Sequence, residues 1–291
     1  MKPVHALMAL AVMAIWGFNF VVAKVAMEQV TPLLLMALRF GIVALILVPF
    51  VKVPWPHLRQ LFLYSVVMGG IHFPLVFSGV RGVDASVASI AIQLQVPFAS
   101  VLAMVFFKDK LGWRRATGMG VAILGVAVIA GVPDGRTSLP HLLMVIAAAI
   151  AFAFSNIQLK WMGGDVDWKI LNAYMALFAV PQLVVLSLIF ETDQIAQIQA
   201  IDGLGLACLA YLSLAATILA YAFWYPLEKK FDVNQTMPFL MLVPIFGVGG
   251  GVLALGEPLT WQLIVGGLLT IGGVGVIMVR RPRLVPGRST T

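Results

Sequence analysis

The chain has 291 residues, of which 61% are hydrophobic and only 11% are charged, and its formal net charge is +7. An average soluble domain carries about a quarter charged residues, so this composition excludes an ordinary soluble enzyme. The single cysteine, Cys208, excludes an intrachain disulfide, and the basic excess is typical of membrane topology, so we expect no nucleic-acid partner.

Ten apolar segments follow one another along almost the whole chain. Each is close to the roughly 20 helical residues that cross a hydrocarbon layer about 30 Å thick. We expect the first to be an uncleaved helix, because its apolar run is too long for a signal peptide. The predicted fold class is an all-α polytopic membrane protein. Its segments are 4–26, 32–51, 61–80, 85–107, 115–132, 139–161, 170–190, 205–225, 234–255 and 261–279.

The lysines and arginines divide unevenly between the two sides of the predicted membrane. With the N-terminus inside, fifteen of the 19 lie on the cytoplasmic side, and only Lys24, Arg81 and Arg136 lie on the other. The remaining one, Arg39, lies within the second segment. Such a bias across short loops predicts orientation. We therefore expect a multi-pass protein of the bacterial inner membrane with both termini in the cytoplasm.

The two halves of the sequence align with each other. Five helices in each half would make the second half enter the membrane from the opposite side, and transporters with such inverted repeats bind substrates near the midplane. The predicted units are residues 1–135 and 136–282, followed by a basic cytoplasmic tail at 283–291. The aligned pairs are His5 with His141, Lys24 with Lys160, Asp84 with Asp232, Asp109 with Glu257, Leu111 with Leu259, Trp113 with Trp261, Gly118 with Gly266 and Gly125 with Gly273.

Several motifs carry a resemblance to a known family. They are Trp16-Gly-Phe-Asn-Phe-Val-Val-Ala-Lys24, Ala37-Leu-Arg39-Phe40, Leu242-Val-Pro244 and Gly256-Glu257-Pro-Leu-Thr-Trp261. Over residues 4–280 the chain resembles the EamA family of the drug/metabolite transporter superfamily, and the stretch 211–224 is similar to amino-acid and cysteine-metabolite exporters. The resemblance implies two EamA-type five-helix repeats forming a basket. It also implies a central cavity lined by helices 1, 3, 4, 6, 8 and 9, with helices 5 and 10 outside.

A polar stripe marks the fourth segment. Ser86, Ser89, Gln93 and Ser100 lie at i, i+3, i+7 and i+14, which is one face of an α-helix. Polar side chains in hydrocarbon need a wet cavity or a partner. We therefore predict that Gln93 and Ser89 bind substrate. The alternative is that the small serines permit close helix packing and bond to their own backbone.

Other candidate site residues lie in four different segments. In the eighth, Tyr221 and Trp224 share a helical face and suit a cavity for an amphipathic metabolite, whereas Tyr225 is expected in the interfacial aromatic belt. An asparagine at depth can bind both ends of a zwitterion, which makes Asn19 and Asn156 candidates. His72 is the histidine nearest mid-membrane and a candidate ligand or proton carrier.

The second segment contains Arg39, which could reach the outer headgroups or attract an anionic group. Because the family has a similar Leu-Arg-Phe at this place, the resemblance favours a structural cap on carbonyl groups of neighbouring helices over substrate contact. Prolines interrupt several predicted helices. Pro97 and Pro244 occupy nearly equivalent places in the two halves, and paired breaks of this kind predict hinge or gating positions.

The predicted function is export of amino acids and related small metabolites by alternating access. The apolar middle of each segment lacks Asp and Glu, which favours facilitative transport; the alternative is a proton-coupled multidrug or toxic-compound exporter. No metalloprotease or hydrolase motif suggests an enzyme, and we expect no metal or cofactor. The partners are a small-molecule substrate and the bilayer. Glycine runs at 247–251 and 272–275 leave both close intramolecular packing and a dimer interface open.

Overall fold

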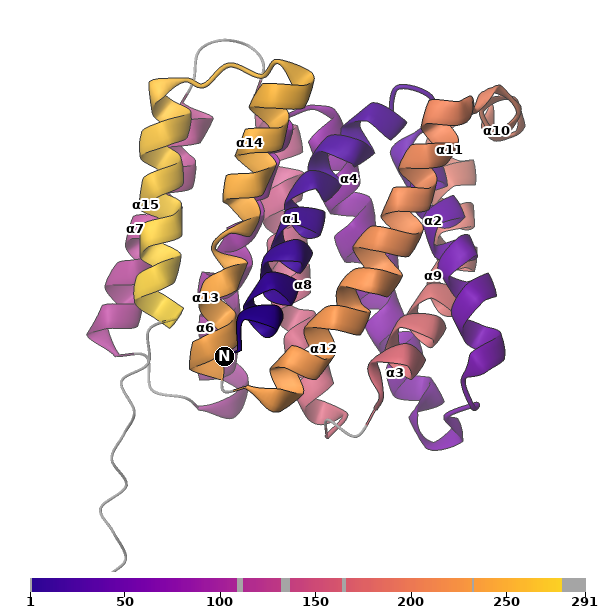
Figure 1. Ribbon diagram of the computed structural model, residues 1–291, viewed down its shortest axis with the longest axis horizontal. Coiled ribbons are helices and arrows are strands. Elements are labelled where there is room, and N and C mark those ends of the chain that lie inside the picture. The colour runs from indigo at the N-terminus through magenta and orange to yellow at the C-terminus, as the bar shows by residue number, and fades with distance from the viewer. Residues whose placement is uncertain (1, 109–111, 132–136, 164–165, 232, 279–291) are drawn as a thin grey trace, which may run out of the picture.

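The computed structural model of the protein describes residues 2–108, 112–131, 137–163, 166–231 and 233–278. Within these residues all regular secondary structure is helical, and 10 helices are long and apolar enough to cross a membrane. They stand side by side with their axes in one general direction (Figure 1). The predicted fold class, a polytopic all-α membrane protein with ten transmembrane helices, is confirmed.

The ten spans agree with the predicted segments except at two ends. The third begins at Trp55 and the eighth runs to Lys230, because polar turns extend both helices beyond their apolar runs. In chain order the spans are α1 (Pro3–Ala26); α2 (Pro32–Leu47) with η1 (Val48–Phe50); η2 (Trp55–His57), α3 (Leu58–Val67), η3 (Met68–His72) and α4 (Phe73–Arg81); α5 (Ala85–Ala91), η4 (Ile92–Leu94) and α6 (Gln95–Phe107); α7 (Trp113–Ala130); α8 (Leu139–Trp161); α9 (Trp168–Phe190); α11 (Gly203–Ala210), η5 (Tyr211–Leu219) and α12 (Ala220–Lys230); α13 (Val233–Leu240) and α14 (Val243–Leu255); and α15 (Trp261–Met278). A short helix that the sequence did not predict, α10 (Gln194–Ala200), connects α9 to α11.

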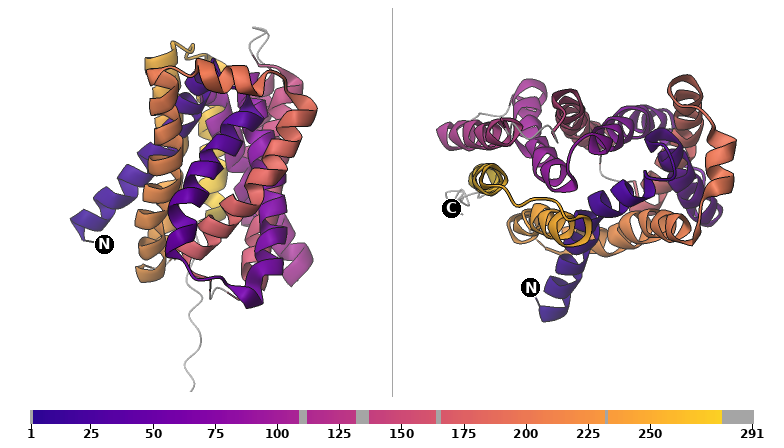
Figure 2. Two further views of the ribbon diagram at one scale, coloured as in Figure 1. Left: turned by 90° about the vertical axis from the view of Figure 1, so that its right-hand side faces the viewer. Right: turned by 90° about the horizontal axis from the view of Figure 1, so that it is seen from above.

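The two halves of the chain interlock in one bundle. Helix α7 packs on α15, α2 on α9, α1 on α14, and α4 on α8, so each of these pairs joins one helix from each half. The views from the side and from above show the same interleaving (Figure 2). The predicted boundary at 135/136, the tail 283–291 and the repeat residues Asp109, Leu111 and Asp232 lie outside the described residues.

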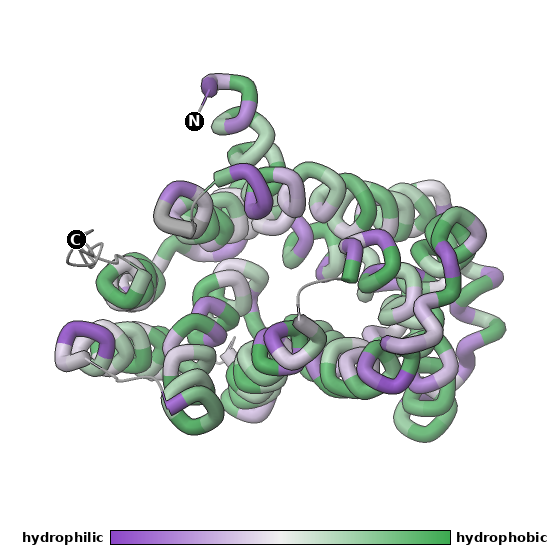
Figure 3. The backbone as a smooth tube through the Cα atoms, turned by 90° about the horizontal axis from the view of Figure 1, so that it is seen from below, coloured by the Kyte–Doolittle hydropathy of each residue, from purple (hydrophilic) through white to green (hydrophobic). Residues whose placement is uncertain are grey.

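The outer surface of the bundle is apolar. Leu45, Phe50 and Leu253 are 77%, 83% and 88% exposed, and hydrophobic residues make up most of each helix (Figure 3). A water-soluble protein rarely exposes so much contiguous apolar surface. This surface is suited to lipid, which requires no polar partners from the side chains that it touches.

Glycines allow α7 and α15 to approach closely. A Cβ atom added at Gly125 would overlap the carbonyl oxygen of Gly266 and the hydroxyl of Thr270, and one at Gly273 would overlap the backbone of Gly118. These positions are therefore occupied by contacts within one chain. The sequence left open whether the glycine run at 272–275 serves close packing within the chain or a dimer interface, and the contact of Gly273 fits close packing within the chain.

We expect Gly125→Ala to destabilise the bundle, because the new methyl group meets backbone rather than a side chain that can move. Overpacking of this kind costs about 1–3 kcal/mol. The measurement is the midpoint of thermal unfolding of the detergent-solubilised protein, followed by fluorescence-detected size exclusion.

Gly120→Ala is the matched control, because Gly120 is on the same helix and a Cβ there meets nothing within 4 Å. Alanine is the better helix former, so this change should leave the midpoint unchanged or raise it. Equal midpoints for the two variants would contradict the close crossing of α7 and α15.

Candidate functional site

A cavity of about 800 Å³ lies among the helices. It brings together six of the seven side chains predicted to bind substrate: Asn19, His72, Gln93, Asn156, Tyr221 and Trp224. The lining comes from the helices that the resemblance implied, and also from α2 and α9. The fifth and tenth spans, which the resemblance placed outside, also border the cavity, through Arg115 of α7 and through Ile277 and Met278 of α15. Helix α2 contributes because the long side chain of Arg39 reaches the cavity, and α9 contributes Trp168 and Asn172 near its start.

The seventh residue, Ser89, is outside the cavity. Its hydroxyl donates to the carbonyl oxygen of Ser86 at 2.8 Å, and its side chain fills the space above Gly247 on α14. The packing alternative therefore describes Ser89. The polar stripe divides because η4 interrupts the helix at Ile92, so that Gln93 and Ser100 line the cavity while Ser86 and Ser89 face α14 and its following loop.

Arg39 is the charged group deep in the cavity, and it is only 4% exposed. Its Nε and Nη2 atoms donate to the hydroxyl of Thr217 at 3.1 and 3.0 Å, and Nη1 donates to Asn19 Oδ1 at 3.2 Å. The hydroxyl of Thr217 donates in turn to the carbonyl oxygen of Leu212 at 2.9 Å. These contacts join α1, α2 and η5, and the partners of the guanidinium are side chains rather than the helix carbonyls that we expected.

Three aromatic rings surround the same guanidinium. The Cζ atom of Arg39 lies 5.7, 5.5 and 5.7 Å from the ring centres of Phe40, Phe73 and Phe77. Ring faces attract a cation without neutralising it, an interaction worth about 2 kcal/mol where water is excluded. Sequence reasoning placed Arg39 in a structural role, and Phe40 directly after it was the available signal of an aromatic environment.

Three polar side chains each have one end held by the protein. The Nδ1 atom of His72 lies 2.9 Å from the carbonyl oxygen of Ala148, and Gln93 Nε2 donates to that of Leu240 at 3.1 Å. A carbonyl oxygen only accepts, so neutral His72 carries its hydrogen on Nδ1 and keeps Nε2 as an acceptor. Gln93 likewise keeps Oε1 as an acceptor, whereas Asn19, whose oxygen accepts from Arg39, keeps its amide nitrogen as a donor.

Aromatic side chains of α1 and α12 form another part of the lining. The Trp16 ring meets those of Tyr221 and Trp224 edge to face at 5.6 and 5.7 Å, and its Nε1 donates to the carbonyl oxygen of Ala216 at 3.2 Å. Tyr225, which we expected in the interfacial belt, also lines the cavity, and its hydroxyl donates to Val166. The cavity is thus suited to a solute that is part polar and part apolar.

Irregular helical turns lie beside the cavity in both halves. The third and eighth spans contain the π-helical segments η3 and η5, and the fourth and ninth are interrupted at η4 and between α13 and α14. Pro97 follows the first interruption and Pro244 the second. The prolines indicated the breaks in the fourth and ninth spans, but no residue pattern indicated the π-helical segments.

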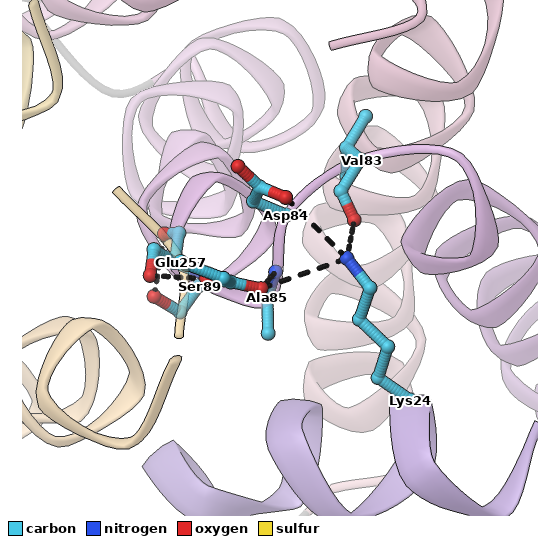
Figure 4. A network of polar contacts seen from close by, with 7 residues as sticks. Lys24, Val83, Asp84, Ala85, Ser89 and Glu257 are labelled. Carbon is cyan, nitrogen blue, oxygen red and sulfur yellow. Dashed lines mark hydrogen bonds and ion pairs between the residues drawn. The ribbon is translucent and has the colours of Figure 1, made fainter. Parts of the chain in front are cut away.

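Polar contacts between the halves lie at the end of the bundle that the lining of the cavity does not reach, and we call this the closed end. The buried carboxylate of Glu257 accepts from the backbone N–H groups of Ala85 at 2.6 Å and Ser86 at 2.9 Å, at the start of α5. Lys24 pairs with Glu257 at 3.5 Å and with Asp84 at 3.6 Å (Figure 4). A carboxylate at a helix N-terminus is stabilised by the N–H groups and by the helix dipole. The sequence showed Lys24, Asp84 and Glu257 as repeat or motif positions, and it did not indicate that they meet.

Two more contacts tie the halves at this closed end. Glu191 accepts from the backbone N–H groups of Leu33 and Leu34 at 2.8 and 3.0 Å, which caps α2. Gln29 donates to Asp202 at 2.8 Å. Hydrogen bonds from the backbone N–H of Gly205 and from the side-chain amide of Gln29 lower the pKa of the Asp202 carboxyl, so Asp202 stays ionised at neutral pH.

The other end of the cavity is bordered by charged side chains, and we call it the open end. Arg115, Lys160 and Glu228 line it, near the start of α7 and the ends of α8 and α12. Lys160 Nζ lies 4.3 Å from the ring centre of Phe107. Among the described residues, no group of three or more His, Cys, Asp or Glu side chains is placed to hold a metal ion.

Comparison with known proteins agrees with this architecture. A family model described as the EamA-like transporter family matches residues 4–131 and 139–279. A Salmonella typhimurium protein named probable amino-acid metabolite efflux pump is 31% identical, over 96% of this chain and 98% of that one. An Escherichia coli protein of the same name is 30% identical, over 92% of each chain. A crystal structure with 18% identity has a TM-score of 0.65 over 95% of this chain and 96% of that chain, a likeness of fold alone.

The different environments of two serines on the fourth span give a direct test of the cavity. In a Cys208→Ala background, we expect Ser100→Cys to react readily with a hydrophilic maleimide, because Ser100 lines the cavity. Ser89→Cys, the matched variant, should react slowly, because its side chain is buried against Gly247. The measurement is the labelling rate by gel shift, and equal rates would contradict the placement of Ser89.

Proposed function

The chain belongs to the EamA-like transporter family, and from this premise we propose that it exports amino acids and related small metabolites through the central cavity. The observation that carries the proposal is the chemistry of the lining. Asn19 offers a donor, His72 and Gln93 offer acceptors, and Trp16 and Tyr221 offer ring faces. Two relatives with about 30% identity are named for amino-acid metabolite efflux, which supports the same substrate class.

The sidedness of the proposal comes from the basic residues. We infer that the protein spans the bacterial inner membrane with both termini in the cytoplasm, so that the open end faces the cytoplasm and the closed end faces outward. Lys160 and Arg115 at the open end agree with the cytoplasmic excess of basic residues. A cavity open to the cytoplasm and sealed outside is the state in which an exporter would load its substrate.

Alternating access is the proposed mechanism. The two units, residues 1–135 and 136–282, would be inverted repeats with Pro97 and Pro244 at equivalent hinges. The interruptions of the fourth and ninth spans, directly before these prolines, support this. Inverted repeats make two alternately open states similar in energy. Opening the closed end would require Lys24 and Glu257 to separate, while α13 and α6 would approach at the open end.

We propose that transport is facilitative. A proton-coupled carrier needs a titratable group in the pathway that changes its charge during the cycle. The acidic side chain among the described cavity residues is Glu228, and it lies at the open end rather than at depth. The substrate gradient would then supply the driving force, with His72 as the group to examine if a pH dependence is found.

The proposal predicts saturable flux of radiolabelled amino acids in proteoliposomes, independent of an imposed pH gradient. Gln93→Leu should reduce this flux about tenfold, because it removes an acceptor worth one hydrogen bond to a charged group. Gln60→Leu is the matched control, because Gln60 is exposed and bonds to His57 outside the cavity. Flux that requires the gradient would favour the proton-coupled exporter, and extrusion of lipophilic cations without amino-acid flux would overturn the substrate class.

Glu257→Gln should shift the protein toward the state open at the other end. A neutral amide loses the ion pair with Lys24 and weakens the bonds to Ala85 and Ser86, each worth about 1.5–3 kcal/mol with a charged acceptor. We expect a cysteine at Ala216, in the Cys208→Ala background, to react about tenfold faster with an impermeant maleimide added at the closed end.

Glu28→Gln is the control for this shift, because Glu28 is an exposed acidic residue at the same end. It should leave the labelling of the Ala216→Cys reporter unchanged from either side. If Glu257→Gln also leaves it unchanged, the Lys24–Glu257 contact does not control access.

A further inference from the structure

The charge of Arg39 has no counterion among the described residues. We propose that Arg39 binds the carboxylate of the transported solute, so that the substrate class is a small metabolite with a free carboxylate next to an apolar group. The proposal rests on the proposed function, because it concerns the same cavity. It assigns to Arg39 the recognition of one functional group.

The first observation is that the partners of Arg39 are neutral. A guanidinium has five N–H hydrogens, and its bonds to Thr217 and Asn19 use three of them. One hydrogen on Nη1 and one on Nη2 therefore have no acceptor among the described residues. Both nitrogens can therefore donate to a further acceptor, and a carboxylate is the acceptor with which arginine pairs better than lysine does.

The second observation is the distribution of charge. The ion pairs within the described residues join Lys24 to Asp84 and Glu257, and Arg39 takes part in none of them. The acidic cavity residue, Glu228, follows Thr217 by eleven positions on one continuous helix, or about 16 Å along its axis. The described lining carries the cations Arg39, Arg115 and Lys160 against that one carboxylate, so an anionic group is attracted inward.

The third observation is that a purely structural role explains the contacts but leaves the charge unexplained. A neutral amide could also link Thr217 to Asn19, and it would avoid the cost of a cation in hydrocarbon. The rings of Phe40, Phe73 and Phe77 instead support a cation and exclude water from it. A buried charge held in this way gains most from an anion that arrives through the cavity.

The remaining polar groups extend the assignment to the other end of the solute. Asn19, which is bound to Arg39, keeps a donor, whereas His72 and Gln93 keep acceptors. Arg39 and Asn19 are therefore donors, and His72 and Gln93 are acceptors lining the same cavity. An amino acid, with a carboxylate and an ammonium group, satisfies both sets; a simple carboxylic acid satisfies the first alone.

The test compares solutes that differ in one group. Neutral amino acids, their primary amides and the matching acids without an amino group are measured in two assays. The assays are quenching of tryptophan fluorescence in nanodiscs, where Trp16 and Trp224 report on the cavity, and flux in proteoliposomes. The wild-type protein should prefer the acid to its amide by about 10- to 100-fold, the range for a hydrogen-bonded charge.

Arg39→Gln should abolish this preference by weakening binding of the acid, while binding of the amide changes little. Arg39→Lys should restore part of it, because the charge is kept and the fork is lost. Arg114→Gln is the matched control, because Arg114 packs on Trp113 outside the cavity, and it should keep the full preference. A structural role for Arg39 would instead lower binding of the acid and the amide equally.

Three binding results would each overturn the inference. They are an unchanged preference in Arg39→Gln, equal wild-type binding of acid and amide, and no binding of any carboxylate. Transport of amides that is independent of Arg39 would overturn it and leave an exporter in place. Binding of the acid through Arg39 without flux would support it and overturn the proposed function. If the acid without an amino group binds more strongly than the amino acid, recognition of a carboxylate by Arg39 would be supported, and an amino acid as the solute would be overturned.

Discussion

Arg39 holds a full positive charge inside a bundle that lipid surrounds, and the centre of the protein is arranged around it. Its bonds to Asn19 and Thr217 fix α1, α2 and η5 relative to one another. The π-helical turn contributes directly, because the Thr217 hydroxyl donates to Leu212, five residues earlier, and both of its lone pairs accept from the guanidinium. The π-helical segment η5 and the Arg39 guanidinium therefore depend on each other, and both line the cavity.

The closed end follows the same rule that a buried charge needs its partners, but there the partners come from the protein. Glu257 from the second half accepts the first N–H groups of α5, and Glu191 does the same for α2. Each helix start thus lacks a local cap and takes one from the opposite half. Interfaces built from a few strong polar bonds can separate as a unit, unlike the glycine-packed contact of α7 with α15.

The sequence was sufficient for those features that depend on one residue type or one period. Apolar length fixed the ten spans, and the helical period of the fourth span indicated that Gln93 faces a cavity. The same helical period gave the wrong environment for Ser89, because η4 changes the period between Ser89 and Gln93. Thr217 lies 178 positions from Arg39, and Ala85 and Ser86 lie 172 and 171 positions from Glu257. Such pairs follow from the packing of helices rather than from local pattern. The π-helical turns and α10 have no local signal for the same reason.

The distribution of regular and irregular helix indicates which parts can move. The pair α7 and α15 is uninterrupted, lies at one edge of the bundle and is packed through glycine to backbone distance (Figure 1), so it resists bending. The third, fourth, eighth and ninth spans border the cavity, and each has a break where backbone bonds are already irregular. Bending there costs fewer regular hydrogen bonds than in an ideal helix. Gln93 bonds across the two breaks to Leu240, so its side chain joins the fourth and ninth spans at the place where both are irregular.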